Sequence, residues 1–201
     1  GLNKSGLASL TYAQTGSNVL ADASSGGYDV QDGSVIFDGS VGGQINFIGN
    51  VLGLDGKNSV ATVLVTNSVI DTPNIGLNNN GGTTNVMTID GNSTVSLSSW
   101  MIFNNGGAGE STLNLNSGTL NVNNGKILMG GAPAPGGVST SILNINGGIL
   151  NNAGGNAFDI GDGGWNGSGV RTGIVNQSGG TNNCNNPLYI GYVATGIGFY
   201  N

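Results

Sequence analysis

Carboxylates are the side chains of this sequence with the clearest capacity for acid–base chemistry. The chain has ten acidic residues, one cysteine and no histidine. The closest acidic groupings are Asp29 with Asp32, Asp38 a few residues further on, and Asp159 with Asp162. Neighbouring carboxylates can act as general acid and base, or as a nucleophile on a sugar, so they raise the alternative of a polysaccharide lyase or hydrolase.

The residue that follows most of these carboxylates favours a structural role instead. Glycine directly follows five aspartates, namely Asp32, Asp38, Asp55, Asp90 and Asp162. Asp-Gly is typical of a tight turn, because aspartate bonds to nearby backbone groups and glycine accepts a positive φ. A catalytic site would also lack a histidine, and Arg171 is the only arginine that could assist it. We therefore predict turns at these positions and a protein that is not an enzyme.

Calcium binding is a separate interpretation of the same residues. The segment FDIGDGGWNGSG (158–169) is rich in aspartate and glycine, whose carboxylate and carbonyl oxygens suit Ca²⁺. It lacks the G-G-x-G-x-D spacing of the calcium-binding nonapeptide repeat. We therefore predict no metal or cofactor, and keep Ca²⁺ at Asp159 or Asp162 as the alternative.

Aromatic residues and the cysteine complete the set of candidate site residues. An exposed aromatic strip can bind sugars, and the candidates for it are Trp100, Trp165, Tyr189, Tyr192 and Tyr200. Tyr189 is the best of these because it is predicted to face outward from its strand. Cys184 aligns with an inward position of the repeat described below, so we expect an inert buried thiol.

The composition excludes several classes of partner and structure. The chain contains 40 glycines and only 7% charged residues, which disfavours helices. A net charge of −6 with four Lys and Arg residues cannot form the basic surface that nucleic acid requires. No apolar run approaches the ~18 residues that span a bilayer, so no transmembrane segment is predicted.

A repeat in the second half of the chain supplies the elements that position these residues. The segments at 111–122, 141–152 and 173–184 align without gaps, each with two short apolar-alternating stretches around a Ser-Gly or Gly-Gly break. The aligned asparagines are separated by 144 − 114 = 30 and 176 − 144 = 32 residues. A third stretch follows each pair (ILMG, FDIG and LYIG) and ends at Gly130, Gly161 and Gly191.

Three short strands in each repeat, joined by turns too short for a helix, predict one coil of a three-sided solenoid. We predict an all-β fold, a right-handed parallel β-helix with coils of about 25–32 residues. Alternation predicts that Asn114, Asp159 and Tyr189, each of which neighbours an inward residue along its strand, face outward or lie at corners. It predicts an inward core ladder of Leu113, Leu115, Leu143, Ile145, Val175, Met129, Ile160 and Ile190.

Departures from the repeat predict local differences. Gln177 and Asn182 replace aliphatic residues, so we expect the coil at 175–184 to be less apolar. Longer loops at 130–140 and 161–172 are expected to project from one edge. Residues 1–60 match the repeat poorly and are expected to form an irregular β cap or opening coils, followed by the repeat solenoid at 61–201.

The stretches VNQSGGT (175–181), LYIGY (188–192) and TGIGFYN (195–201) resemble the repeat of bacterial autotransporter-associated β-strand proteins and of related secreted proteins with PEP-CTERM-type sorting signals. The resemblance covers roughly residues 84–201. It implies a β-solenoid that is exported and displayed on the cell surface, with a role in adhesion or matrix formation and no catalytic residues.

Together, these features predict a secreted, extracellular and non-enzymatic structural protein. We expect a subunit or segment of a surface fibre, sheath or adhesin that associates with itself by coil stacking into a homopolymer. The alternatives are a carbohydrate-binding adhesin module, which binds a glycan or another cell-surface ligand through Tyr189, and, as a third reading, the lyase or hydrolase.

Overall fold

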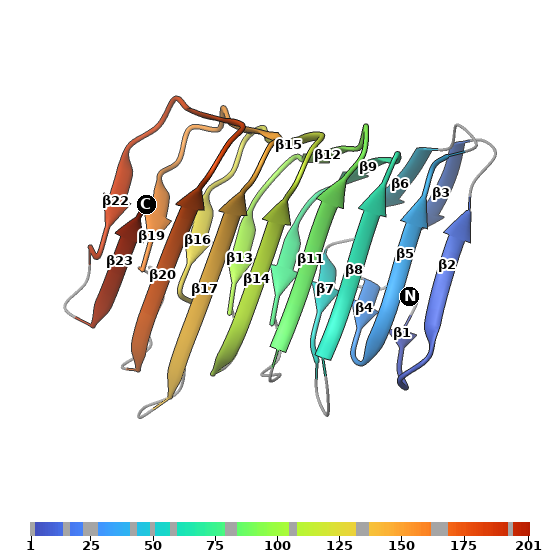
Figure 1. Ribbon diagram of the computed structural model, residues 1–201, viewed down its shortest axis with the longest axis horizontal. Helices are drawn as coiled ribbons and strands as arrows, with labels where there is room; N and C mark the ends of the chain where they lie inside the picture. The colour runs from blue at the N-terminus through green and yellow to red at the C-terminus, as the bar shows by residue number, and fades with distance from the viewer. Residues whose placement is uncertain are drawn as a thin grey trace.

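The computed structural model describes residues 3–13, 17–21, 28–40, 44–48, 51–56, 60–78, 84–104, 108–131, 137–161, 169–192 and 195–201. Within these residues the regular structure is β-strand throughout, without a helix. Figure 1 shows that the strands form successive rungs of a solenoid along the long axis, with the N- and C-termini toward opposite ends. No helix that could cross a bilayer occurs among these residues.

The strands belong to three sheets, here called A, B and C. Sheet A contains β1 (Asn3–Lys4), β4 (Tyr28–Val30), β7 (Leu52–Leu54), β10 (Ile75–Leu77), β13 (Met101–Phe103), β16 (Ile127–Met129), β19 (Phe158–Ile160) and β22 (Leu188–Ile190). Sheet B contains β2 (Ser9–Ala13), β5 (Gly33–Asp38), β8 (Val60–Thr66), β11 (Thr84–Asp90), β14 (Gly109–Leu115), β17 (Val138–Ile145), β20 (Val170–Gln177) and β23 (Gly196–Tyr200). Sheet C contains β3 (Ser17–Ala21), β6 (Gln44–Ile48), β9 (Val69–Thr72), β12 (Thr94–Leu97), β15 (Thr119–Val122), β18 (Ile149–Asn152) and β21 (Thr181–Cys184).

The chain visits the three sheets in rotation, so each sheet takes every third strand. Adjacent rungs pair in parallel, and the sequence distance between paired residues ranges from 75 − 52 = 23 to 181 − 149 = 32. Parallel strands joined in this way stack ~4.8 Å apart and exchange backbone hydrogen bonds with the rungs on both sides. The predicted all-β, three-sided parallel solenoid is confirmed.

The aligned repeats of the sequence occupy consecutive rungs in register. Leu113 of β14 pairs with Leu143 of β17, which pairs with Val175 of β20. Leu115 and Ile145 pair in the same way two residues further along. Because a shift of one residue would turn every side chain to the opposite face of its sheet, this register decides which residues enter the interior.

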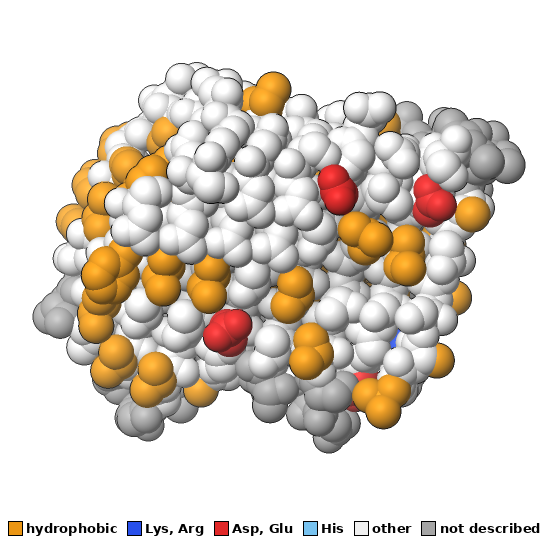
Figure 2. Space-filling view, viewed as in Figure 1, with side chains coloured by type: hydrophobic (Ala, Val, Ile, Leu, Met, Phe, Trp, Pro, Cys, Tyr) orange, Lys and Arg blue, Asp and Glu red, His pale blue; other side chains and the backbone are white. Residues whose placement is uncertain are grey.

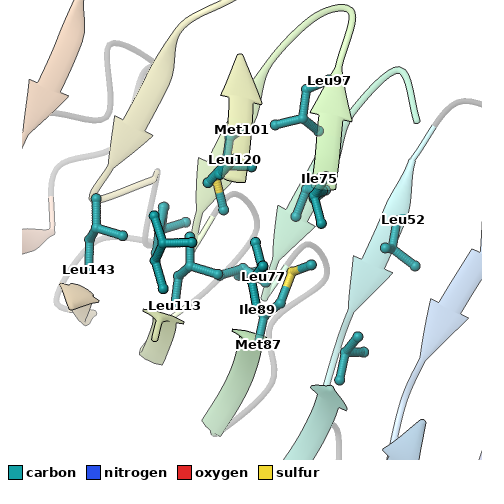
Figure 3. Close-up of a cluster of buried hydrophobic side chains, with 14 of the residues drawn as sticks. Leu52, Ile75, Leu77, Met87, Ile89, Leu97, Met101, Leu113, Leu120 and Leu143 are labelled. Carbon is teal, nitrogen blue, oxygen red and sulfur yellow. The ribbon is translucent and has the colours of Figure 1, made fainter. Parts of the chain in front are cut away.

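The interior is a continuous column of aliphatic and aromatic side chains from all three sheets. Figure 3 shows part of it, in which Leu97, Met101 and Leu113 from sheets C, A and B lie around one space. Residues along the strands of sheet B alternate between buried and partly exposed, as expected when side chains point to opposite faces. The ladder residues that are at most 1% exposed are Leu113, Leu115, Leu143, Ile145, Val175, Met129 and Ile160.

Ile190 differs from this ladder in its exposure. It pairs in register with Ile160, which is buried, yet Ile190 itself is 49% exposed. An interior side chain is covered by the rungs before and after it, and β22 is the last described strand of sheet A. Ile190 therefore has the predicted register, but the prediction that it is buried is wrong.

The corner between sheets A and B depends on backbone in the left-handed region. One residue directly after each sheet-A strand has positive φ in five successive rungs, at Asn78 (58°), Asn104 (57°), Gly130 (136°), Gly161 (76°) and Gly191 (65°). Glycine and asparagine reach this region at the lowest cost. A Cβ on Gly161 would also collide with the carbonyl oxygen of Ile197. The glycine markers of the repeat are therefore corner residues.

Residues 3–56 supply the first strands of the same three sheets. β5 pairs in register with β8, and β4 pairs with β7, without a change of direction. These pairings place β4 and β5 in the same sheets as β7 and β8, and the division of the chain at residue 60 stays a prediction. The longer connections in the second half run from β16 to β17 and from β19 to β20, so both lie at the corner between sheets A and B.

Adjacent residues on β17 allow a matched test of the core. Leu143 is buried, whereas Ile142 lies on the outer face and is partly exposed. We expect Leu143→Ala to lower the free energy of unfolding by about 2–5 kcal/mol, because it leaves a cavity between two rungs. Ile142→Ala should cost about 1 kcal/mol or less. Urea titrations measure both, and equal losses would contradict the assigned register.

Candidate functional site

The fold places Asp29 and Asp159, which belong to two acidic groupings of the sequence, far apart. Asp29 lies on β4 and accepts a hydrogen bond at Oδ2 from Gln31 Nε2 at 3.0 Å, and Asp32 is buried at the following corner. Asp159 lies on β19, five rungs further along sheet A, which corresponds to ~24 Å. Figure 2 shows the outer face of sheet B, where the visible acidic side chains are well separated.

Two of the Asp-Gly turns, those at Asp38 and Asp90, have the hydrogen bonds that the sequence predicts. The Oδ1 atom of Asp38 accepts a hydrogen bond from Ser40 N at 2.9 Å. The Oδ1 atom of Asp90 accepts bonds from Gly91 N at 2.8 Å and from Ser117 Oγ at 2.8 Å. Gly91 has a φ of 61°. These carboxylates therefore hold corners of the solenoid through hydrogen bonds to their own turn or to the next rung.

Asp159 differs from its expected position. It was predicted to face outward or to lie at a corner, but only 6% of its surface is exposed. It occupies the central position of β19, in register with Leu128 and Tyr189. The equivalent residues Ile102 and Leu128 are buried outside the main core, so the outer face of sheet A is covered at these rungs and alternation alone does not predict exposure there.

The prediction of no bound metal, and the alternative of Ca²⁺ at Asp159 or Asp162, both stay untested. Asp162 lies outside the described residues, as does Trp165. In the parts of the chain that the structure describes, no three His, Cys, Asp or Glu side chains form a group that could hold a metal ion.

Asparagine side chains form a hydrogen-bonded ladder along the outer face of sheet B. Asn144 Nδ2 donates to Asn114 Oδ1 at 2.8 Å, and Asn176 Nδ2 donates to Asn144 Oδ1 at 2.9 Å. Asn201 Nδ2 continues the series to Asn176 Oδ1 at 2.9 Å. At the other end Asn114 Nδ2 lies 3.4 Å from Thr88 Oγ1. Every amide donates toward the N-terminal end, so the ladder has a direction.

A second ladder of the same kind runs along sheet C. Asn151 Nδ2 donates to Asn121 Oδ1 at 2.9 Å, and Asn183 Nδ2 donates to Asn151 Oδ1 at 2.8 Å. An amide offers both donors and acceptors, which allows it to bond to an identical neighbour on each side. Among the described residues, the Oδ1 atoms of Asn183 and Asn201 accept no bond, so both ladders end at the C-terminal rung with an open acceptor.

The interior becomes polar at the same end of the solenoid. Gln177 follows Ile145 in one column, and its Oε1 accepts a hydrogen bond from Tyr200 Oη at 2.5 Å. Asn182 follows Leu150 in another and donates from Nδ2 to Tyr200 Oη at 3.1 Å. The less apolar character expected near residues 175–184 is therefore observed. Its function in hydrogen bonding to Tyr200 could not be deduced from the repeat.

Cys184 lies beside this polar cluster at an inward position. It is a free thiol, partly buried against the core and in register with Asn152. Asn152 Nδ2 lies 3.9 Å from Cys184 Sγ, which in turn lies 3.4 Å from the carbonyl oxygen of Asn186. The thiol is thus only partly buried and has polar neighbours, whereas the alignment with Val122 predicted a buried thiol.

Apolar side chains are exposed at the C-terminal rung. Leu188 and Ile190 on β22 are 40% and 49% exposed, and Phe199 on β23 is 48% exposed. Tyr189 is exposed as predicted from its outward position, and its ring lies 4.9 Å from the ring of Tyr192, centroid to centroid. This rung therefore combines sheet edges, apolar side chains and the ends of two polar ladders.

Comparisons of the chain with protein-family models, with curated proteins and with solved structures find no match.

The pKa of Asp90 allows a test of its structural role. The hydrogen bond from Gly91 N, followed by that from Ser117, lowers the pKa of this carboxyl. A lowered folded-state pKa contributes stability above the unfolded value of about 3.9, and this contribution is lost as the pH falls through the folded value.

We therefore expect Asp90→Asn to remove part of the acid destabilisation. Urea midpoints of the wild type and the variant, measured from about pH 5 to about pH 2, should converge as the pH falls. A constant difference between the two midpoints over this range would show that Asp90 does not titrate with folding.

Proposed function

We propose that this chain is a non-catalytic, extracellular structural protein, a segment of a surface fibre, sheath or adhesin that associates with a second copy of itself by coil stacking. The observation that carries the proposal is the in-register parallel stack, in which inward columns and asparagine ladders continue from rung to rung along the described coils. The edge of such a stack is a template for another strand.

The first rung of a second copy matches the interior columns that reach this end. Leu10 belongs to the same column as Val175 and Tyr200, through the successive pairings of sheet B. Tyr12 belongs to the column that ends at Gln177. Stacking would place Leu10 on Tyr200, which continues that column by one rung. Tyr12 would lie two rungs from Gln177, because no residue of β23 belongs to the Gln177 column.

The outer ladder of sheet B can continue across the same junction. Thr11 is the N-terminal residue of the row that contains Thr88 and the ladder asparagines. Its hydroxyl can donate a hydrogen bond to the open Oδ1 of Asn201. A threonine also bonds to a ladder asparagine inside the chain, where the hydroxyl oxygen of Thr88 accepts from Asn114 Nδ2; at the junction the threonine would be the donor.

The non-catalytic and extracellular parts of the proposal are supported by residue usage. Asp38 and Asp90 are engaged in the turns of the solenoid. The low content of charged residues and the amide-rich outer rows suit a surface that relies on backbone pairing and side-chain ladders. The resemblance to secreted solenoid repeats points to the same setting.

The column that contains Ile190 provides a sharp test of stacking. Its N-terminal member is Lys4, through the pairings of sheet A. Stacking of two copies therefore places Lys4 of one copy next to Ile190 of the other. In the wild type the Nζ atom of Lys4 bonds to the carbonyl oxygens of Ser5, Gly6 and Asp32. In Ile190→Lys, the new lysine on β22 would oppose strand pairing and would face the like charge of Lys4 from the second copy.

We expect the wild-type protein to form concentration-dependent end-to-end assemblies and Ile190→Lys to be monomeric in sedimentation velocity. The double variant Lys4→Glu/Ile190→Lys should regain assembly, because opposite charges then meet. Val138→Lys is the matched control, since Val138 is 57% exposed but lies on β17, away from the last rung. A wild type that stays monomeric at all concentrations would contradict the proposal, and so would equal assembly in wild type and Ile190→Lys.

A further inference from the structure

A hollow on the outer face of sheet A has the chemistry of a sugar-binding site. It encloses about 190 Å³ and lies at the corner where the chain enters β13 and β16. Its lining consists of Ser99, Trp100, Ile102, Asn124, Gly125, Lys126, Leu128 and Asn156. We propose that this hollow binds a pyranose ring of a polysaccharide, with preference for a sugar that carries a carboxylate.

The floor of the hollow is apolar. Ile102 and Leu128 are the central residues of β13 and β16, pair in register, and are 3% and 0% exposed. They do not belong to the main core cluster. Because these two side chains are covered, the apolar surface left for the C–H face of a pyranose ring, the apolar side of an otherwise hydroxylated ligand, is that of Trp100.

The wall and rim supply the aromatic and polar groups that such a ring requires. Trp100 is partly exposed, and an indole offers a flat apolar face together with an N–H donor. Asn124 and Asn156 are exposed and provide amide donors and acceptors for hydroxyl groups. The lining therefore combines one stacking surface with hydrogen-bonding groups around it.

Lys126 gives the site its charge preference. It is the one charged residue of this lining, in a chain that has only four Lys and Arg residues. Lys126 follows Trp100 at the same position of the next rung, since Met101 N donates to Lys126 O while Ile75 N donates to Trp100 O. The backbones of Trp100 and Lys126 lie one rung, or ~4.8 Å, apart, so the positive charge of Lys126 favours a carboxylated sugar stacked on Trp100.

The backbone around the hollow is fixed before any ligand binds. Trp100 N donates to Asn74 Oδ1 at 3.1 Å, which holds the start of β13 to the preceding rung. A Cβ on Gly125 would collide with the carbonyl oxygen of Ser99, so the two turns are in close contact and no side chain enters the hollow there. A site already formed in the free protein avoids part of the entropic cost of binding.

The test is calorimetric titration of the protein with trigalacturonate and with cellotriose. We expect trigalacturonate to bind more tightly, and salt to weaken its binding. Trp100→Ala should weaken binding of trigalacturonate at least about tenfold, Trp100→Phe should retain part of it, and Lys126→Gln should remove the preference for the acidic sugar. Tyr189→Ala and Tyr192→Ala are matched aromatic controls, on or just after β22 and so three rungs from Trp100 along sheet A, and should bind as the wild type does.

Several results would overturn the assignment. These are the absence of binding of both sugars to the wild type, an unchanged affinity in Trp100→Ala, equal affinity for cellotriose and trigalacturonate, or loss of binding in Tyr189→Ala instead. Urea midpoints show whether Trp100→Ala is folded. If it is not, Lys126→Gln and Trp100→Phe, which keep the floor of the hollow intact, decide the question.

Discussion

The structure depends on the stacking of inward side chains from rung to rung. Val63, Met87, Leu113, Leu143 and Val175 form one such column, and each is covered on both sides by the next member. A single coil has no interior of its own, because its side chains are buried only when neighbouring coils supply the rest of the shaft. Stability therefore accumulates along the axis, and the terminal rungs are the least covered parts.

Polar groups in this solenoid obey the same rung-to-rung rule as the apolar core. The amides of Asn114, Asn144 and Asn176 bond to one another because the parallel register brings identical side chains side by side. The same register that buries leucine inside thus aligns asparagine outside. Both sets of contacts reach the last described rung, so the core and the ladders follow one register along the whole described stack.

Much of this architecture could be predicted from spacing alone. The repeats at Leu113, Leu143 and Val175 fixed the register because period and alternation both follow from strand geometry. The solvent exposure of Asp159 and Ile190 was less predictable, because it depends on what covers their strands rather than on the sequence of the strands themselves. The hydrogen bonds of Tyr200 with Gln177 and Asn182, and the hollow next to Trp100, require positions on different coils that no local pattern relates.

The most direct test of the central claim is a cross-link between consecutive rungs. In a Cys184→Ser background, cysteines at Asn114 and Asn144 would lie on paired positions ~4.8 Å apart, within the Cα distance of about 4.4–6.8 Å that a disulfide requires. Mass spectrometry after mild oxidation should show complete cross-linking of this pair and little for Asn114→Cys with Thr140→Cys, which is four residues out of register. Equal cross-linking of the two pairs, or none in either, would contradict the in-register stack.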